Sequence, residues 1–332
     1  MTLRTNLRFR TAHLQPSRGS RPPTGELRRQ SRLRSCAPVF TLLATALLAA
    51  GATSAKAGTP AEATRGEIVA AYGFLPGFFK ALPDNALPGA WAEMKQFQDG
   101  TTALPNKVKD LIGLAVAAQA GARTSVYAYT RCAQAFGATE AEVKEAATLA
   151  ALTRHWSTIF NGLMLDETKY RADTAKMVDY LTKMATGKVP PPKPIAITDA
   201  RSAMDDARQM FGFVPDFVQR VPAEALPGAW LELKSVEMNP ETAIAGKYKS
   251  LISLAVASQI PCRYCVIADT EFAKLDGATD REINEAITMA GLARHWITLG
   301  DGLQLDEKQF RRDIDRLVQG AGATKTAAVV RR

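Results

Sequence analysis

The sequence predicts an all-α protein built from two tandem copies of one helical unit. Three observations support this prediction. Residues 109–171 align without a gap with residues 249–311, and 32 of the 63 positions are identical. Within each copy, apolar residues recur at the three- and four-residue spacing of an amphipathic helix. No stretch shows the sustained alternation of apolar and polar residues that indicates a β-strand. We therefore expect about six helices in each copy.

Residues 1–57 have the order of features found in a secretory signal peptide. Arginines that include Arg28 and Arg29 precede an apolar run at 39–50, and the sequence Ala-Lys-Ala follows at 55–57. The run is too short to span a bilayer. We expect general export, in preference to the twin-arginine route, and a periplasmic or secreted protein. The alternative is a basic leader that is retained in the cytoplasm.

The positive net charge belongs to this leader. The whole chain carries a formal charge of +9, but residues 1–57 hold ten of its 42 basic residues and one of its 33 acidic residues. The rest of the chain therefore has 32 of each sign. A balanced body does not favour a basic groove for nucleic acid. We expect no nucleic-acid partner, and no membrane partner once the leader is removed.

The repeat and the proline content define the remaining segments. Copy one covers residues 58–186 and copy two covers residues 199–320. Residues 187–198 between them include four prolines, which cannot be helical and predict a short extended linker. Upstream of residue 100 the offset between the copies is 139 instead of 140, so copy two has gained one residue. The small and polar residues 321–332 predict a flexible tail.

Helix boundaries repeat between the copies. The apolar period first appears at Leu111–Ala118 and again from Leu251. A Gly-Ala-Thr sequence then ends one helix and begins the next in each copy, with the threonines at 139 and 279 and a glutamate three residues after each, which predicts a capping box. Asp306 predicts another helix start. Trp91 and Trp230 follow Pro-Gly-Ala and are expected to anchor the core.

Copy two alone contains a Cys-x-x-Cys pair. Pro261 can end one helix and begin the next, which places Cys262 and Cys265 in the first turn of the new helix. Unpaired N–H groups and the helix dipole favour a thiolate there, and Arg263 could add positive potential. This arrangement suits a redox dithiol. An inert structural disulfide is the main alternative, and a zinc site is disfavoured because too few further ligands exist.

The residues around this pair resemble the carboxymuconolactone decarboxylase / alkylhydroperoxidase D-like family. The resemblance covers the core of both copies and rests on Leu-Ile-Ser-Leu-Ala-Val-Ala at 251–257, Cys-Arg-Tyr-Cys at 262–265, Gly-Ala-Thr at 277–279 and Glu-Ile-Asn-Glu-Ala at 282–286. It implies an all-α fold and a homo-oligomer, for which we expect a trimer. It also implies a hydroperoxide substrate, an external thiol reductant, and no metal or organic cofactor.

The family also implies residue roles. In its peroxidases the second cysteine attacks the peroxide and the first resolves it, which would make Cys265 the nucleophile. The helix dipole argument favours Cys262, and we follow the family. Its proton relay uses a glutamate and a histidine, but Ser250 and Asp269 stand at those positions. Asp269 could hold a proton if it is buried. His295 is a candidate replacement donor, although copy one retains the equivalent His155 without any dithiol.

Copy one has lost the chemistry of the pair. Ala122, Ser125 and Tyr129 stand where copy two has its two cysteines and its aspartate, so we expect copy one to be a scaffold. Cys132, which has no cysteine counterpart in copy two, is expected to be a buried core thiol. The leading hypothesis is an exported oxidoreductase that uses peroxide as acceptor. The alternatives are a cofactor-free decarboxylase or lactone-processing enzyme, and a non-catalytic binding or structural protein.

Overall fold

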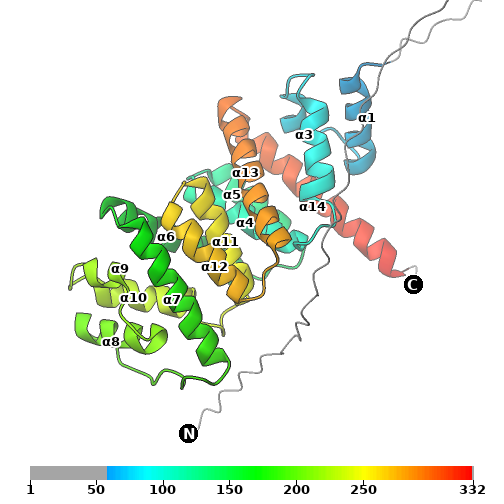
Figure 1. Cartoon of the computed structure of the whole chain (residues 1–332). Helices are drawn as coiled ribbons and strands as arrows, with labels where there is room; N and C mark the ends of the chain where they lie inside the picture. Colours follow the sequence, from blue (N-terminus) through cyan, green and yellow to red (C-terminus); the bar gives the residue numbers. More distant parts are fainter. Residues whose placement is uncertain (1–57, 331–332) are drawn as a thin grey trace, which may run out of the picture. The chain divides into compact units, whose positions relative to one another are not determined.

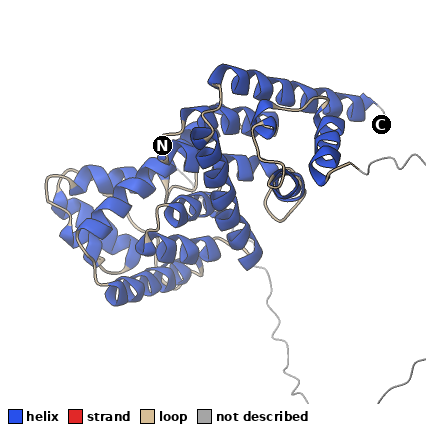
Figure 2. Cartoon of the chain, turned by 90° about the horizontal axis from the view of Figure 1, so that it is seen from above, coloured by secondary structure: helices blue, strands red, loops and turns tan. Residues whose placement is uncertain are grey.

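The computed structural model describes the backbone of residues 58–330 and the side chains of residues 58–320. The expected signal peptide and Cys36 lie outside this part of the chain. Every regular element within it is a helix (Figure 2), which confirms the all-α prediction. No described helix combines the length and apolar character needed to cross a membrane.

Each copy contributes seven α-helices, one more than expected, because a short helix follows each Pro76 or Pro215. Copy one also has a π-helix, η1 (Met94–Gln98). The helices of copy one are α1 (Pro60–Tyr72), α2 (Gly77–Lys80), α3 (Leu87–Glu93), α4 (Asn106–Gln119), α5 (Arg123–Ala135), α6 (Glu140–Gly162) and α7 (Glu167–Ala185). Those of copy two are α8 (Ala200–Phe211), α9 (Asp216–Arg220), α10 (Leu226–Val236), α11 (Gly246–Gln259), α12 (Arg263–Leu275), α13 (Asp280–Gly302) and α14 (Glu307–Val330).

The predicted helix boundaries are found in the structure. Thr139 and Thr279 both form complete capping boxes, at the starts of α6 and α13. Asp306 accepts a hydrogen bond from the backbone N–H of Gln309 at the start of α14. No helix is present from 188 to 198, where the prolines predict the linker. The backbone is helical to Val330, in the segment for which the sequence predicts a flexible tail.

The two copies share one central core and exchange their C-terminal helices. Helices α4 and α11 pack against each other and against the first halves of α6 and α13. Beyond this core, α7 of copy one packs on α12 of copy two, and α14 of copy two packs on α5 of copy one. Figure 1 shows α7 beside α8–α10 at one end, and α14 near α1 and α3 at the other. Each half of the molecule therefore contains helices from both copies.

The length of α6 and α13 makes this exchange possible. Each has 23 residues, which corresponds to about 35 Å of helix. The first half of each helix lies in the central core and its second half reaches an outer cluster. The end of α6 packs with α7–α10 and α12, and the end of α13 packs with α1–α3 and α14. The predicted anchors Trp91 and Trp230 are buried in these clusters.

Candidate functional site

The Cys-x-x-Cys pair begins helix α12. Cys262 is the N-cap residue and Cys265 is the third helical residue. The backbone N–H of Cys265 donates to Cys262 Sγ over 3.3 Å. Both are free thiols in this structure, with exposed fractions of 0% and 5%. The helix start therefore holds two buried thiols against each other, as the sequence predicts, and directs an amide N–H at the first.

Copy one covers these thiols with side chains that the sequence analysis missed. Asn161, on α6, places its Nδ2 3.6 Å from Cys262 Sγ. Ser157 lies one turn earlier and its hydroxyl helps to lower the Cys262 pKa. The hydroxyl of Tyr264 donates to the carbonyl of Leu165 over 2.6 Å, which ties the start of α12 to copy one. Copy one is therefore part of the dithiol site and not only a scaffold.

These contacts shift the pKa values of the two thiols in opposite directions. The hydrogen bond with the Cys265 thiol lowers the pKa of Cys262 to about 6, assisted by Ser157, the Cys265 N–H and Asn161, and opposed by burial. The same hydrogen bond raises the pKa of Cys265 far above its ordinary value, and burial and the negative charge of Asp269 add to the effect. The pair therefore shares one proton, with the thiolate on Cys262 and the proton on Cys265.

Two carboxyl groups lie behind the thiols. Asp269, on α12, is 8% exposed, and its Oδ2 is buried without a hydrogen-bond partner among the described residues. Burial raises its pKa well above the ordinary value, and the charges of Glu237 and Cys262 raise it further. Glu237, the C-cap residue of α10, has a pKa raised by burial as well. Both carboxyls therefore keep a proton to a higher pH than a solvent-exposed carboxyl does.

Glu237 was not predicted as a site residue, although a sequence signal exists. Copy one has the uncharged Gln98 at the equivalent position, so the charge is specific to the copy that has the thiols. The hydroxyl of Ser253 lowers the pKa of Glu237, but the two groups do not reach hydrogen-bond geometry, and Ser253 Oγ is buried without a partner in the described part of the chain. The space behind the thiols therefore contains polar atoms without a hydrogen-bond partner among the described residues.

The other candidates occupy different places. His295 is exposed on α13 beside Trp296, and that tryptophan packs with Phe78 and Phe79 of copy one. The structure therefore does not bring His295 to the dithiol. Arg263 points into solvent and forms an ion pair with Glu167 of copy one over 3.6 Å. The exposure of Arg263 limits its electrostatic effect on the buried thiols.

The buried lysines hold loops. Lys249 donates from Nζ to the carbonyls of Val236 and Asn239. The equivalent Lys109 donates to the carbonyls of Phe97 and Gly100. The same contact occurs in both copies, with and without thiols. It therefore shapes the loop before α4 or α11 and does not depend on the dithiol.

The equivalent site in copy one contains a cavity instead of thiols. Ser125 and Tyr129 line it, in the places of Cys265 and Asp269. Cys132 lines it as well and is half-buried, which corrects the expectation of a core thiol. The equivalent Phe272 of copy two is also half-buried, but it packs against an apolar cluster instead of lining a cavity. Across the described residues, no group of three or more His, Cys, Asp or Glu side chains is arranged to hold a metal ion.

Comparison with known proteins identifies the repeated unit. Residues 86–165 and 224–307 each match the model of the carboxymuconolactone decarboxylase family. The first match spans α3 to α6 and the second spans α10 to α13, which includes the dithiol. No curated protein and no solved structure matches the chain. The two matches confirm the resemblance and the tandem arrangement that the sequence predicts.

Proposed function

Because the chain belongs to the carboxymuconolactone decarboxylase family, we propose that it is a thiol-dependent, peroxidase-like redox protein. The observation that carries the proposal is the placement of two buried free thiols side by side, with the Cys265 N–H and the Asn161 amide both directed at Cys262. A thiolate on Cys262, whose pKa is lowered to about 6, provides a nucleophile at neutral pH. A protonated Cys265 provides a resolving thiol next to it. No metal or organic cofactor takes part in this chemistry.

In the first step, the Cys262 thiolate attacks the outer oxygen of a hydroperoxide. The S–O bond forms while the O–O bond breaks, which leaves a sulfenic acid on Cys262 and an alkoxide. A carboxyl proton held by Asp269 and Glu237 passes to the alkoxide, which leaves as an alcohol. Burial raises the pKa of both carboxyls, so a proton is available there. This pair takes the place of the missing relay glutamate and histidine.

In the second step, Cys265 transfers its proton to the Asp269 carboxylate and attacks the sulfur of the sulfenic acid. The S–S bond forms while the S–O bond breaks, and the departing hydroxide takes the proton and leaves as water. An external thiol reductant then returns two electrons and two protons to the disulfide. The cycle oxidises the reductant and reduces the hydroperoxide to an alcohol and water.

This proposal exchanges the cysteine roles that the family resemblance implies. The family would make Cys265 the nucleophile. In this chain the hydrogen bond with Cys262 and burial raise the pKa of Cys265. The N–H of Cys265 and the side chain of Asn161 are both directed at Cys262. The hydrogen bonds of this site therefore favour Cys262 as the thiolate.

The test is to expose the fully reduced chain to an alkyl hydroperoxide and identify the oxidised cysteines by mass spectrometry. We expect a Cys262–Cys265 disulfide in the wild type. The Cys265→Ser variant should accumulate a sulfenic acid on Cys262, trapped with dimedone, and the Cys262→Ser variant should consume no peroxide. The matched control Cys132→Ser should behave as the wild type.

Two outcomes would contradict this assignment. Sulfenic acid on Cys265 in the Cys262→Ser variant would restore the family's order of roles. Peroxide consumption that is unchanged in both variants would remove the dithiol from the chemistry. Turnover of a lactone or a decarboxylation that survives both serine substitutions would instead support the cofactor-free alternative.

We also propose that the protein works outside the cytoplasm. The proposal rests on the order of basic, apolar and small residues in 1–57. N-terminal sequencing of the protein recovered from a cell envelope extract should begin at residue 58. A mature protein that retains the basic leader and stays in the cytosolic fraction would refute it.

A further inference from the structure

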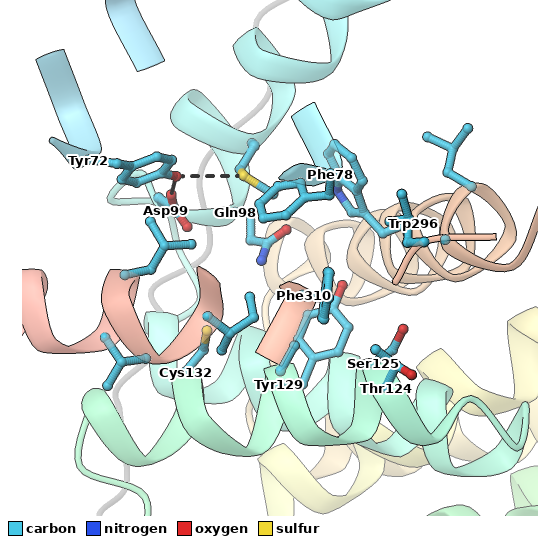
Figure 3. Close-up of a pocket in the computed structure, with 18 of the residues that line it drawn as sticks. Tyr72, Phe78, Gln98, Asp99, Thr124, Ser125, Tyr129, Cys132, Trp296 and Phe310 are labelled. Atoms are coloured by element: carbon cyan, nitrogen blue, oxygen red, sulfur yellow. Dashed lines mark hydrogen bonds between the residues drawn. The ribbon is translucent and has the colours of Figure 1, made fainter. Parts of the chain in front are cut away.

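The cavity of copy one occupies the position that corresponds to the dithiol site of copy two. Its volume is about 350 Å³, at the lower end of the range for small-molecule sites. Thr124 and Ser125 stand on its wall where copy two has Tyr264 and Cys265 (Figure 3). The rest of the wall is mostly aromatic and aliphatic, and comes from α1, α2, η1, α5, α13 and α14. The cavity is therefore the counterpart, in copy one, of the dithiol site in copy two.

Side-chain size explains why this space is open in one half and filled in the other. In copy two the ring of Tyr264 packs edge-on against Tyr170 and Phe160, with centroids 5.3 and 6.1 Å apart. At the cavity, Thr124 of copy one stands in the place of Tyr264, and Gly300, on α13 of copy two, stands in the place of Phe160. Two rings are thus missing. A Cβ placed on Gly300 would meet only Leu305 Cδ1, at 3.9 Å, so packing does not require glycine there.

The polar groups of the cavity define what it can hold. Gln98 Oε1 is buried without a hydrogen-bond partner among the described residues, and Figure 3 shows its amide directed into the cavity above Tyr129 and Phe310. Its oxygen is enclosed by neighbouring side chains, so the polar groups that a ligand can reach are the hydroxyls of Thr124, Ser125 and Tyr129. The hydroxyl of Tyr72 is not available as a donor in the cavity, because it already donates to Asp99 Oδ2 over 2.8 Å.

Charge excludes an anionic ligand. No lysine, arginine or histidine lines the cavity, whereas the carboxylates of Asp99 and Asp301 do. A buried carboxylate would therefore find no cation among the lining residues. An ammonium group is not favoured either, because Asp301 is exposed and the carboxylate of Asp99 is already paired with Tyr72. The remaining match is a neutral molecule whose polar group can form hydrogen bonds with the hydroxyls of the wall.

We propose that copy one is a binding site for a neutral, apolar molecule with one terminal hydroxyl, such as a medium-chain or aromatic alcohol. The hydroxyl lies among the hydroxyl groups of the wall, and the apolar body fills the space that Tyr264 and Phe160 occupy in copy two. Ala122 and Ser125 replace the thiols, so the site binds its ligand without oxidising or reducing it. This inference is independent of the proposed peroxidase chemistry.

Cys132 allows a direct test in the full-length chain. Replacement of the other three cysteines with serine, in Cys36→Ser, Cys262→Ser and Cys265→Ser, leaves Cys132 as the only thiol. Octanol, octanoate and octylamine provide ligands of matched length that differ in the terminal group. We expect calorimetry to show octanol binding, with octanoate and octylamine weaker by about tenfold or more. Octanol should also slow the modification of Cys132 by a small methanethiosulfonate reagent.

Substitutions taken from copy two provide the control for position. The pair Thr124→Tyr and Gly300→Phe should fill the cavity and abolish octanol binding. Thr298→Phe adds the same bulk to an exposed site on the same helix and should leave binding unchanged. If the double variant does not fold, Cys132→Phe tests the same point, because phenylalanine is the residue of copy two.

Three results would overturn the proposal. The first is octanol binding that persists in the filled variant. The second is octanoate binding as tightly as octanol. The third is Cys132 modification that octanol does not slow. Because the dithiol is absent from the protein used for the titrations, none of these results depends on peroxide turnover.

Discussion

The substitution Asn161→Asp tests whether copy one controls the chemistry of copy two. Asn161 Nδ2 lies 3.6 Å from Cys262 Sγ. Loss of a hydrogen bond to a charged group costs about 1.5–3 kcal/mol. A carboxylate at this distance repels the thiolate by about 1 kcal/mol in water and about 5 kcal/mol at an effective dielectric constant of about 20. The side chain of Asn161 is exposed, which favours the lower end, so we expect the pKa of Cys262 to rise by about two units.

The assay is the rate of Cys262 alkylation as a function of pH in the Cys132→Ser background, with the modified residue identified by mass spectrometry. In the parent, the rate should be half-maximal near pH 6, because the pKa of Cys262 is lowered to about 6. In Asn161→Asp the midpoint should move upward. The matched control is Asp301→Asn, the reverse change at the equivalent position of copy two, which should leave the midpoint unchanged. Equal midpoints in the parent and in Asn161→Asp would refute the claim that α6 stabilises the thiolate.

Three further predictions concern stability and access. Tyr264→Thr removes the hydrogen bond to Leu165 and two ring contacts, so it should lower the free energy of unfolding by about 2–4 kcal/mol. It should also speed alkylation of the dithiol, and an unchanged alkylation rate would show that Tyr264 does not cover the thiols. Glu285 accepts the N–H groups of residues 103 and 104, which with other contacts lower its pKa to about 2 against the opposing effect of burial. The contribution of the Glu285 carboxylate to stability is complete above its unfolded pKa of about 4.5 and is lost as the pH falls toward about 2, a total of about 3 kcal/mol. Urea titrations near pH 5 and pH 3 should therefore show a smaller loss of stability at the lower pH in Glu285→Gln than in the wild type. Lys249→Met leaves two buried carbonyls unpaired and should cost about 2–4 kcal/mol in urea; a cost near zero would contradict the role of Lys249 in holding the loop.

The sequence alone predicted the features that depend on neighbouring residues. Capping at Thr139 and Thr279 involves side chains three residues apart, so their spacing is visible in the chain itself. The position of Cys262 and Cys265 at a helix start follows from Pro261 for the same reason. The duplication also gives an internal comparison, because Lys249 has the counterpart Lys109 whereas the thiols occur in copy two alone.

Contacts between the copies were beyond this reasoning. Asn161 and Cys262 are separated by 101 residues, and nothing in their local sequence indicates that α6 extends into the other half. The signal that exists is indirect. Ser157 and Asn161 differ from their counterparts Ile297 and Asp301 within an otherwise similar stretch. These differences acquire meaning only once the exchange of C-terminal helices shows which site each helix end covers.

The exchange also explains how one chain can maintain two different sites. In a symmetric pair of identical units, both sites would meet the same helix end, and Phe160 would fill the second site as it fills the first. Fusion of two copies lets the end of α6 and the end of α13 differ. Phe160 and Asn161 then serve only the dithiol, whereas Gly300 and Asp301 serve only the cavity. The loss of thiols from copy one therefore does not make it redundant, because its helices still build the site that copy two needs.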